Sequence, residues 1–144
     1  MVLIDTNILV NRVLRNHIEL KQNDLNILKQ FEEIPAEQIF VPSYVITEFL
    51  ILIQKVVVKR FHFDKKISQI LYRNSIMLIG RLITYANIIN PTSIELTEAL
   101  AINEEYFKTN KDLSYTDILL LVTSKFRKLD LLSMDKMLNK EIVR

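Results

Sequence analysis

Four short apolar runs, each followed by a segment with helix-forming signals, constrain the fold of this chain more than any other feature. Each run is three or four residues long, as short strands are, and Val2–Ile4 is typical of a strand buried in a sheet. Strands that alternate with helices, on connections too long for hairpins, form sheets that are mostly parallel. We therefore predict an α/β fold with a mostly parallel central sheet, built from Val2–Ile4, Ile39–Val41, Asn87–Asn90 and Asp130–Ser133.

The segments between these runs carry the start signals and apolar periodicity of helices. A capping-box pattern at Thr92–Glu95 predicts the start of one helix. The long helix that carries Glu48 and the helix after it are expected to form an antiparallel pair, of a kind that often builds dimer surfaces. Helices are expected to start after Asp5, at Asp24, at Ser43, at Phe61, at Thr92, at Ser114 and near Asp135, and an edge strand is expected at Glu141–Arg144.

The chain has 144 residues and no repeat, low-complexity tract or Gly/Ser/Pro linker, so we expect one domain over residues 1–144. Its start, Met1–Asp5, has no basic region before the first carboxylate, and we expect no signal peptide. Polar and charged side chains interrupt the apolar stretch Val45–Val58, which predicts a buried helix and no membrane span. The absence of cysteine suits the reducing cytosol, and we predict a cytoplasmic protein.

Residue types that are nearly absent from the chain exclude several kinds of chemistry. The single glycine, Gly80, cannot build a dinucleotide-binding turn, a P-loop or a nucleophile elbow. Without cysteine there are no disulfides, thiolate zinc sites, iron–sulfur clusters or cysteine nucleophiles. The two histidines, His17 and His62, are too few and too far apart for an H-E-x-x-H site. If the chain is an enzyme, the most plausible catalytic site is a set of carboxylates that hold a hard cation.

The charge of the chain is compatible with a nucleic-acid partner but is too weakly basic to indicate one by itself. The net charge is +2 and the isoelectric point is about 8.8. Arg12 and Arg15 are candidates for phosphate contacts, and a solvated helix face is the equal alternative. Two basic clusters are interpreted as solvated helix faces: Lys55, Lys59, Arg60, Lys65 and Lys66, and then Lys125, Arg127 and Lys128.

Three acids stand at the starts of expected helices, where a capping role explains each of them alone. Asp5 and Asp135 come at the ends of apolar runs, and Asp117 stands three positions after Ser114, as in a capping box. Glu48 differs, because it lies inside an apolar helix with no capping role to fill. Such a carboxylate either reaches solvent along a polar stripe or belongs to a cluster that a cation stabilises. The sequence favours neither interpretation of Glu48 over the other.

Taken together, the four acids predict a cation site. In a parallel α/β sheet, function gathers where strands end and the following helices begin, and all four acids can converge there. Crowded carboxylates repel one another, so such a cluster is stable mainly when cations occupy it. Oxygen ligands alone select Mg²⁺, Mn²⁺ or Ca²⁺ over zinc or copper. A site of this kind is typical of enzymes that hydrolyse phosphodiester bonds.

Four segments of the chain resemble, in order, the four acidic motifs of PIN-domain nucleases. The first segment, Leu3–Leu9, contains Asp5-Thr6-Asn7 after a strand and is the most specific of the four. The other three gain their weight from their order along nearly the whole chain. They are Pro42–Phe49, Leu113–Asp117 and Leu132–Asp135.

This resemblance implies a metal-dependent endoribonuclease with a three-layer α/β/α sandwich fold. The catalytic acids and ligands of Mg²⁺ or Mn²⁺ would be Asp5, Glu48, Asp117 and Asp135. The residues that orient those acids or a water would be Thr6, Asn7 and Ser133. Small members of the family are often toxins of type II toxin–antitoxin pairs, which implies an RNA substrate, a small antitoxin partner and a homodimer.

Two other interpretations remain open at this point. In one, the chain is a PIN-like module that binds RNA or protein through a degenerate, non-catalytic site. In the other, it is a phosphoryl-transfer fold with Asp5 as nucleophile, although such enzymes need a second acid two positions on, where Asn7 stands. Two features depart from the family pattern: Met134 stands where a small or amide residue is expected, and the segment between Glu48 and Asp117 is long and helical.

Overall fold

The central sheet is parallel, as the alternation of strands and helices predicts. The structure, a computed structural model, describes residues 1–109 and 111–143. In these residues four strands pair in the order β3-β2-β1-β4. Leu3 of β1 pairs with Phe40 of β2 on one side and with Leu131 of β4 on the other, so β1 lies inside the sheet. The strands are β1 (Val2–Ile4), β2 (Ile39–Pro42), β3 (Asn87–Ile89) and β4 (Asp130–Leu132).

Within the described residues, six α-helices and one short 3₁₀ helix connect the strands, and a seventh α-helix follows β4. The ends of the expected helices differ from the observed ends by a few residues. The helices are α1 (Thr6–Leu14), α2 (Gln22–Glu33), η1 (Ala36–Gln38), α3 (Ser43–Phe61), α4 (Lys65–Tyr85), α5 (Ser93–Lys108), α6 (Tyr115–Arg127) and α7 (Lys136–Val143).

The prediction of an edge strand at Glu141–Arg144 is wrong. The residues from Glu141 to Val143 belong to α7, and Arg144 lies outside the described residues. Asp135 caps this helix, since its Oδ1 accepts a hydrogen bond of 3.2 Å from the Leu138 amide. Leu138 is completely buried. Because no glycine or proline follows, the helix continues through the segment that was expected to be extended.

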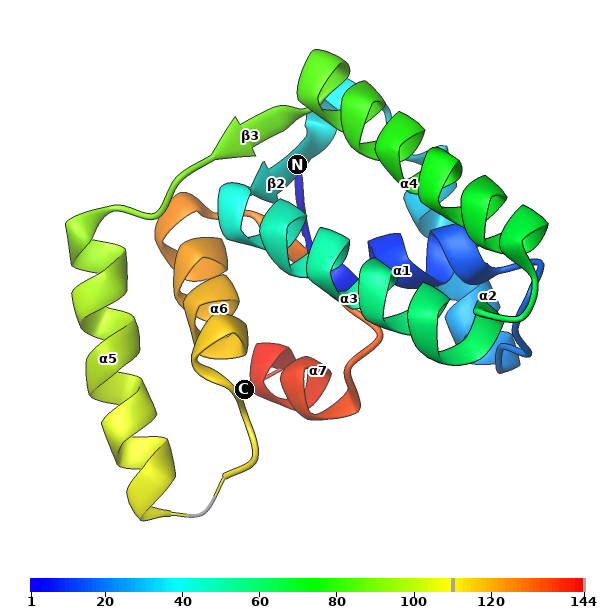
Figure 1. Cartoon of the computed structure of the whole chain (residues 1–144). Helices are drawn as coiled ribbons and strands as arrows, with labels where there is room; N and C mark the ends of the chain where they lie inside the picture. Colours follow the sequence, from blue (N-terminus) through cyan, green and yellow to red (C-terminus); the bar gives the residue numbers. More distant parts are fainter. Residues whose placement is uncertain (110, 144) are drawn as a thin grey trace.

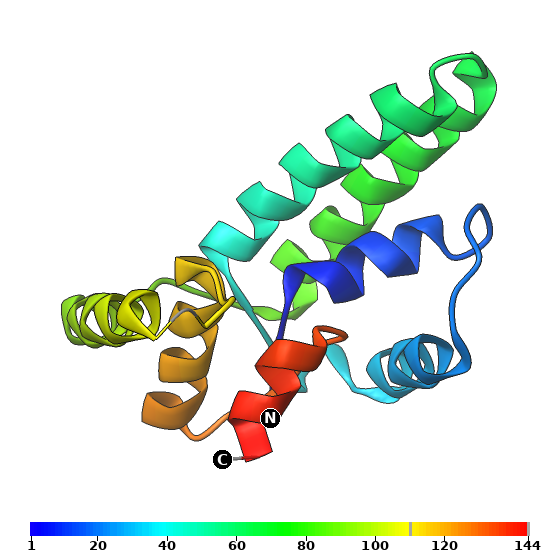
Figure 2. The ribbon, with the colours of Figure 1, turned by 90° about the horizontal axis from the view of Figure 1, so that it is seen from below.

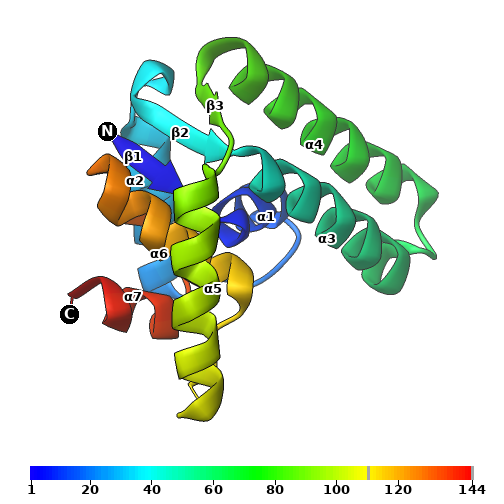
Figure 3. The same cartoon turned by 90° about the vertical axis from the view of Figure 1, so that its left-hand side faces the viewer.

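The crossovers place the helices on two faces of the sheet. From β1 to β3 the chain moves toward one edge, and from β3 it returns to β4 at the opposite edge. Because such crossovers are right-handed, α1 to α4 lie on one face while α5 and α6 lie on the other (Figures 1 and 3). The structure therefore has the three-layer α/β/α arrangement that the resemblance implies.

Burial of apolar side chains holds these layers together. Leu3 and Ile4 of β1 and Val41 of β2 are completely buried in the sheet. Ile8 of α1 and Ile118 of α6 are completely buried as well, one from each helical layer. Each such side chain contributes about 1.5–3 kcal/mol relative to an exposed position. The apolar runs of β1 and β2 thus form the middle of the core.

Helices α3 and α4 form a long antiparallel hairpin that projects away from the sheet (Figure 2). Their 19 and 21 residues pack along a seam that buries Phe49, Ile53 and Leu71. The predicted antiparallel pair is therefore confirmed. Most of the stretch Val45–Val58 packs in this hairpin, and no helix in the described part of the chain is long and apolar enough to cross a membrane.

Candidate active site at the carboxyl edge of the sheet

Asp5 lies where β1 ends and α1 begins, and it is 5% exposed. Its backbone amide donates to the Leu132 carbonyl at 3.1 Å, which continues the β1–β4 ladder by one residue. Its Oδ1 accepts a hydrogen bond of 2.6 Å from the Thr6 amide. Its Oδ2 accepts one of 2.7 Å from the Ser133 hydroxyl. The capping interpretation of Asp5 is therefore correct, and the second oxygen also joins the ends of two neighbouring strands.

The carboxyl group of Asp5 resists ionisation. Burial raises its pKa to about 6, although the hydrogen bonds from Ser133 and Thr6 oppose this rise. The negative charges of Asp117 and Glu48 raise the pKa of Asp5 further. These carboxylates come from α6 and α3, so the fold brings three acids from distant parts of the sequence into one electrostatic environment.

Asp117 occupies the third position of α6 and is half-buried. It forms the capping box that the sequence predicts. Its amide donates to the Ser114 hydroxyl at 3.2 Å, and its Oδ2 accepts from the Ser114 amide at 3.4 Å. Burial raises the pKa of Asp117, the Ser114 hydrogen bonds lower it, and the charge of Asp135 raises it again. Asp117 therefore links the surroundings of Asp5 to those of Asp135.

The loop from β4 to α7 is tied to the start of α1. The hydroxyl of buried Ser133 donates to Asp5 and accepts a hydrogen bond of 3.0 Å from the Asp135 amide. The Met134 amide donates to Oδ1 of Asn7 at 3.2 Å. These three bonds fix the end of β4 relative to the acid that follows β1.

Two asparagines that the sequence analysis did not single out complete this loop. Asn11 donates through Nδ2 to the Asn7 carbonyl and to the Met134 sulfur, each at 3.0 Å. Asn139 donates to the Ser133 carbonyl at 2.9 Å. Met134, a departure from the family pattern, therefore has a polar partner in this loop. The Asn11 and Asn139 contacts on this loop had no local sequence signal, because both asparagines donate to backbone carbonyls and Asn11 also meets a side chain 123 positions away.

Among the described residues, the carboxylate of Glu48 has no ion-pair partner and the hydroxyl of Thr6 has no hydrogen-bond partner. Glu48 is half-buried on α3 and forms no ion pair with any described residue. Its charge is therefore not neutralised by a neighbouring cation. The hydroxyl of Thr6 is buried and has no hydrogen-bond partner in the described part of the chain. Buried polar atoms of this kind are normally satisfied, by water or a ligand where the protein offers nothing.

The four acids are coupled through space but do not meet at one point. Among the described residues, no group of three or more His, Asp or Glu side chains is arranged so that it could hold a metal ion. Asp5 experiences the charges of Glu48 and Asp117, and Asp117 experiences that of Asp135. A set of buried and half-buried carboxylates nevertheless fits a hard cation by its chemistry, because the positive charge would offset both burial and repulsion.

The two arginines of α1 are engaged in an ion-pair cluster between helices. Arg12 Nε lies 3.0 Å from Oε1 of Glu32, and Arg15 Nη1 lies 2.6 Å from the same oxygen. Both arginines thereby connect α1 to α2. This pairing gives Arg12 and Arg15 a structural role between α1 and α2, and their phosphate contacts stay a prediction.

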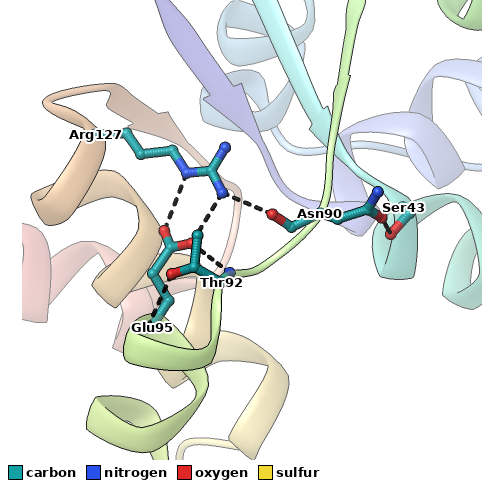
Figure 4. Close-up of polar contacts among 5 residues, drawn as sticks. All are labelled: Ser43, Asn90, Thr92, Glu95 and Arg127. Atoms are coloured by element: carbon teal, nitrogen blue, oxygen red, sulfur yellow. Dashed lines mark hydrogen bonds and ion pairs between the residues drawn. The ribbon is translucent and has the colours of Figure 1, made fainter.

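A second polar cluster connects α5 and α6 to the start of α3 (Figure 4). Arg127 binds both carboxylate oxygens of Glu95, at 2.9 and 3.1 Å, and donates to the Asn90 carbonyl at 2.7 Å. Glu95 also forms the predicted capping box with Thr92. The side chain of Asn90 accepts a hydrogen bond of 2.5 Å from the Ser43 hydroxyl at the first residue of α3. This cluster supports the helix on which Glu48 lies.

Arg127 lowers the pKa of Glu95 to about 2, although Glu95 is 2% exposed. The bidentate ion pair is the main cause, and the Thr92 hydrogen bonds add to it. Lys125 and Lys128 are exposed as expected. The expectation that Arg127 shares their solvated face is wrong, because a partner 32 positions away in sequence holds its side chain.

Residues 2–140 match the family model of the PIN domain. The match covers nearly the whole chain, and the chain belongs to the PIN-domain family. The resemblance that the four acidic segments indicate is therefore confirmed at the level of the family.

Several solved structures share this fold. VapC20 from Mycobacterium tuberculosis, a toxin that cleaves the sarcin–ricin loop, superposes with a TM-score of 0.68 and 12% identity, over 98% of this chain and 95% of that one. FitAcB from Neisseria gonorrhoeae has a TM-score of 0.66 and 12% identity, over 99% and 94%. A toxin–antitoxin complex from Klebsiella pneumoniae has a TM-score of 0.54 and 21% identity, over 91% and 83%. No curated protein matches the chain significantly in sequence.

Proposed function

We propose that the chain is a metal-dependent endoribonuclease that hydrolyses RNA phosphodiester bonds. One observation carries this proposal: Asp5 is buried at the carboxyl end of the central strand and experiences the charges of Glu48 and Asp117. In a PIN-domain chain, this arrangement of carboxylates corresponds to a nuclease site. The proposed catalytic acids and metal ligands are Asp5, Glu48, Asp117 and Asp135.

The donor set favours Mg²⁺ or Mn²⁺, because carboxylate oxygens suit hard cations. A bound cation of this kind supplies charge stabilisation at the phosphate and a water of lowered pKa. The chain's own residues hold the acids in place for this chemistry. The hydroxyl of Ser133 and the amide of Thr6 fix the two oxygens of Asp5, and Asn7 fixes the loop that leads to Asp135.

We further propose that the chain is the toxin of a type II toxin–antitoxin pair. Two of the structures with the same fold support this, since one is a toxin that cleaves the sarcin–ricin loop and another is a toxin–antitoxin complex. The proposed partners are an RNA substrate, a small antitoxin and a second copy of the chain. We assign the protein to the cytoplasm and its single domain to residues 1–144.

A nuclease assay tests the proposal. Purified protein is incubated with total RNA and Mn²⁺ or Mg²⁺, with EDTA as a control, beside Asp5→Asn and Glu48→Gln. Cleavage should require the metal and should be lost in both variants. Glu98→Gln is the matched control, because Glu98 is exposed on α5. Cleavage that persists in EDTA or in Asp5→Asn would contradict the proposal.

The spacing of the acids favours one alternative, a PIN-like module that binds RNA or protein through a degenerate site. Its support is that no three described acidic or histidine side chains are arranged to hold a metal ion. This alternative predicts RNA or protein binding without metal-dependent cleavage. It also predicts that Mn²⁺ leaves the thermal stability of the protein unchanged.

A further inference from the structure

The α3–α4 hairpin, residues 43–85, carries an excess of positive charge. It holds seven of the 19 Lys and Arg residues of the chain but two of the 17 Asp and Glu residues. The hairpin is therefore strongly basic, whereas the remainder of the chain has more acids than bases. The basic cluster in the hairpin is exposed, as the sequence predicts; its members are Lys55, Lys59, Arg60, Lys65 and Lys66.

The lysines of the hairpin differ from the arginines of α1 and α6, which are held in ion pairs. Arg12 and Arg15 of α1 are paired with Glu32, and Arg127 of α6 is paired with Glu95. In the described part of the chain, no lysine of the hairpin takes part in an ion pair. Exposed positive charge without an ion-pair partner among the described residues is therefore a feature of the hairpin, and it also occurs at Lys29 on α2 and Lys125 on α6.

Two of these lysines share one face of α3 with Glu48. Lys55 and Lys59 stand seven and eleven positions after Glu48, close to two and three whole turns of an α-helix. At about 1.5 Å per residue, they lie roughly 10 and 16 Å further along the helix axis. Because α3 begins at the carboxyl end of β2, the helix leads outward from the candidate active site (Figure 1).

An acidic active site needs a basic surface beside it if its substrate is RNA. The carboxylates around Asp5 repel phosphate groups, so the affinity for RNA has to come from cations outside the acidic cluster. Lysine contacts to the phosphate backbone provide affinity and position a strand without reading its sequence. Lys55 and Lys59 are exposed, have no ion-pair partner among the described residues and lie in line with Glu48.

We propose that Lys55 and Lys59 form a phosphate-binding track that holds the RNA strand and directs it to Glu48 and Asp5. This inference rests on the proposed function, since it names the residues that bind the substrate of the same site. The track binds the sugar–phosphate backbone, so it accepts single-stranded RNA of any sequence. Both lysines are positioning residues that act on the strand beside the bond that is cut.

Binding can be measured apart from cleavage. The full-length protein in EDTA is titrated with a fluorescent single-stranded RNA of mixed sequence at a series of KCl concentrations. For Lys55→Ala/Lys59→Ala, the slope of log K against log[KCl] should become less steep by about 1.4, because each phosphate contact to a single strand contributes about 0.7. The matched control Lys29→Ala/Lys125→Ala removes the same charge from exposed positions on α2 and α6 and should keep the wild-type slope.

Cleavage assays with the same proteins give a second readout. The Lys55→Ala/Lys59→Ala variant should have a raised KM and an unchanged kcat, as expected when substrate and transition state lose the same contact. The inference is overturned if the wild-type protein does not bind the RNA, or if both double variants have the same salt slope. If RNA binding depends on Lys55 and Lys59 but no metal-dependent cleavage occurs, the proposed nuclease function fails and the binding track stands.

Discussion

The hydroxyl of Ser133 donates a hydrogen bond of 2.7 Å to Oδ2 of Asp5, across 128 positions of sequence. The bond joins the ends of β1 and β4, which are neighbours in the sheet. The same hydroxyl accepts a hydrogen bond from the Asp135 amide. One buried serine thus connects two of the four acids that the sequence singles out.

The first prediction concerns this serine. Ser133→Ala removes the donor to Asp5 and the acceptor for the Asp135 amide, while the cavity left by one oxygen is small. We expect a loss of about 10–100-fold in metal-dependent cleavage or in metal affinity, the usual effect of removing a group that orients a ligand. Cleavage rates at a series of Mn²⁺ concentrations measure it. Ser93→Ala, an exposed serine at the start of α5, is the control, and equal losses in both variants would contradict the assigned role.

The second prediction concerns the stability of the metal-free protein. Because burial raises the pKa of Asp5 from 3.8 to about 6, its ionised form destabilises the folded state at pH 7. Asp5→Asn keeps a side-chain oxygen for the cap and removes the charge. The free energy of unfolding in EDTA at pH 7 should therefore rise by roughly 2–3 kcal/mol, measured by urea denaturation.

The pH dependence of this gain checks its cause. A raised pKa means that the folded wild-type protein loses stability as the pH rises from about 4 to about 6. The advantage of Asp5→Asn should therefore be absent near pH 4 and complete above about pH 6. Asp130→Asn, at an exposed position of β4, should show no such change. An advantage that is independent of pH would point to packing and not to charge.

Much of the fold follows from local sequence signals. The apolar runs mark the strands, and the Ser/Thr-x-x-Asp/Glu patterns at Thr92 and Ser114 form the capping boxes that they predict. The expected strand at Glu141–Arg144 fails because four residues hold too little information to distinguish the last turn of a helix from a short strand. The order of the strands in the sheet depends on tertiary packing, which no local pattern records.

The candidate site is less accessible to sequence reasoning. The chain order of the four acids identifies them as candidates, but their mutual distances depend on the strand order and on the paths of α3 and α6. The ion pair between Arg127 and Glu95 also cannot be predicted from the sequence, because the two residues lie on different helices, 32 positions apart. For the same reason, nothing local distinguishes the paired Arg12 and Arg15 from the lysines of α3, which form no ion pair in the part of the chain that the structure describes.

The third prediction concerns metal binding. A cation that binds the folded state stabilises it by mass action, by about 2.7 kcal/mol at a concentration of 100 Kd. For a domain of this size, that gain corresponds to a rise in Tm of roughly 5–10 °C. The rise should be seen with Mn²⁺ in the wild-type protein and in Glu98→Gln, and it should be lost in Asp5→Asn and Glu48→Gln. No rise in any of the four proteins would favour the degenerate-site alternative, and the same rise in all four would show that Mn²⁺ binds away from Asp5 and Glu48.

The last prediction concerns the Glu95–Arg127 pair and acid stability. The pKa of Glu95 is lowered from 4.5 to about 2, so the pair contributes stability above pH 4.5, and this contribution is lost as the pH falls toward 2. Glu95→Gln should therefore lower the free energy of unfolding by about 2 kcal/mol at pH 7, with a difference from wild type that shrinks between pH 4.5 and 2. Glu98→Gln, on the exposed face of the same helix, should change the stability little at either pH. A constant difference between pH 7 and 2 would show that the charge of Glu95 is not the source of the stability.

The same pair should also hold the start of α3. Because Arg127 binds the Asn90 carbonyl and Asn90 binds Ser43, Glu95→Gln should loosen the start of α3, measured as faster amide hydrogen exchange there. Unchanged exchange in α3 would show that the pair does not couple α5 and α6 to the helix of Glu48.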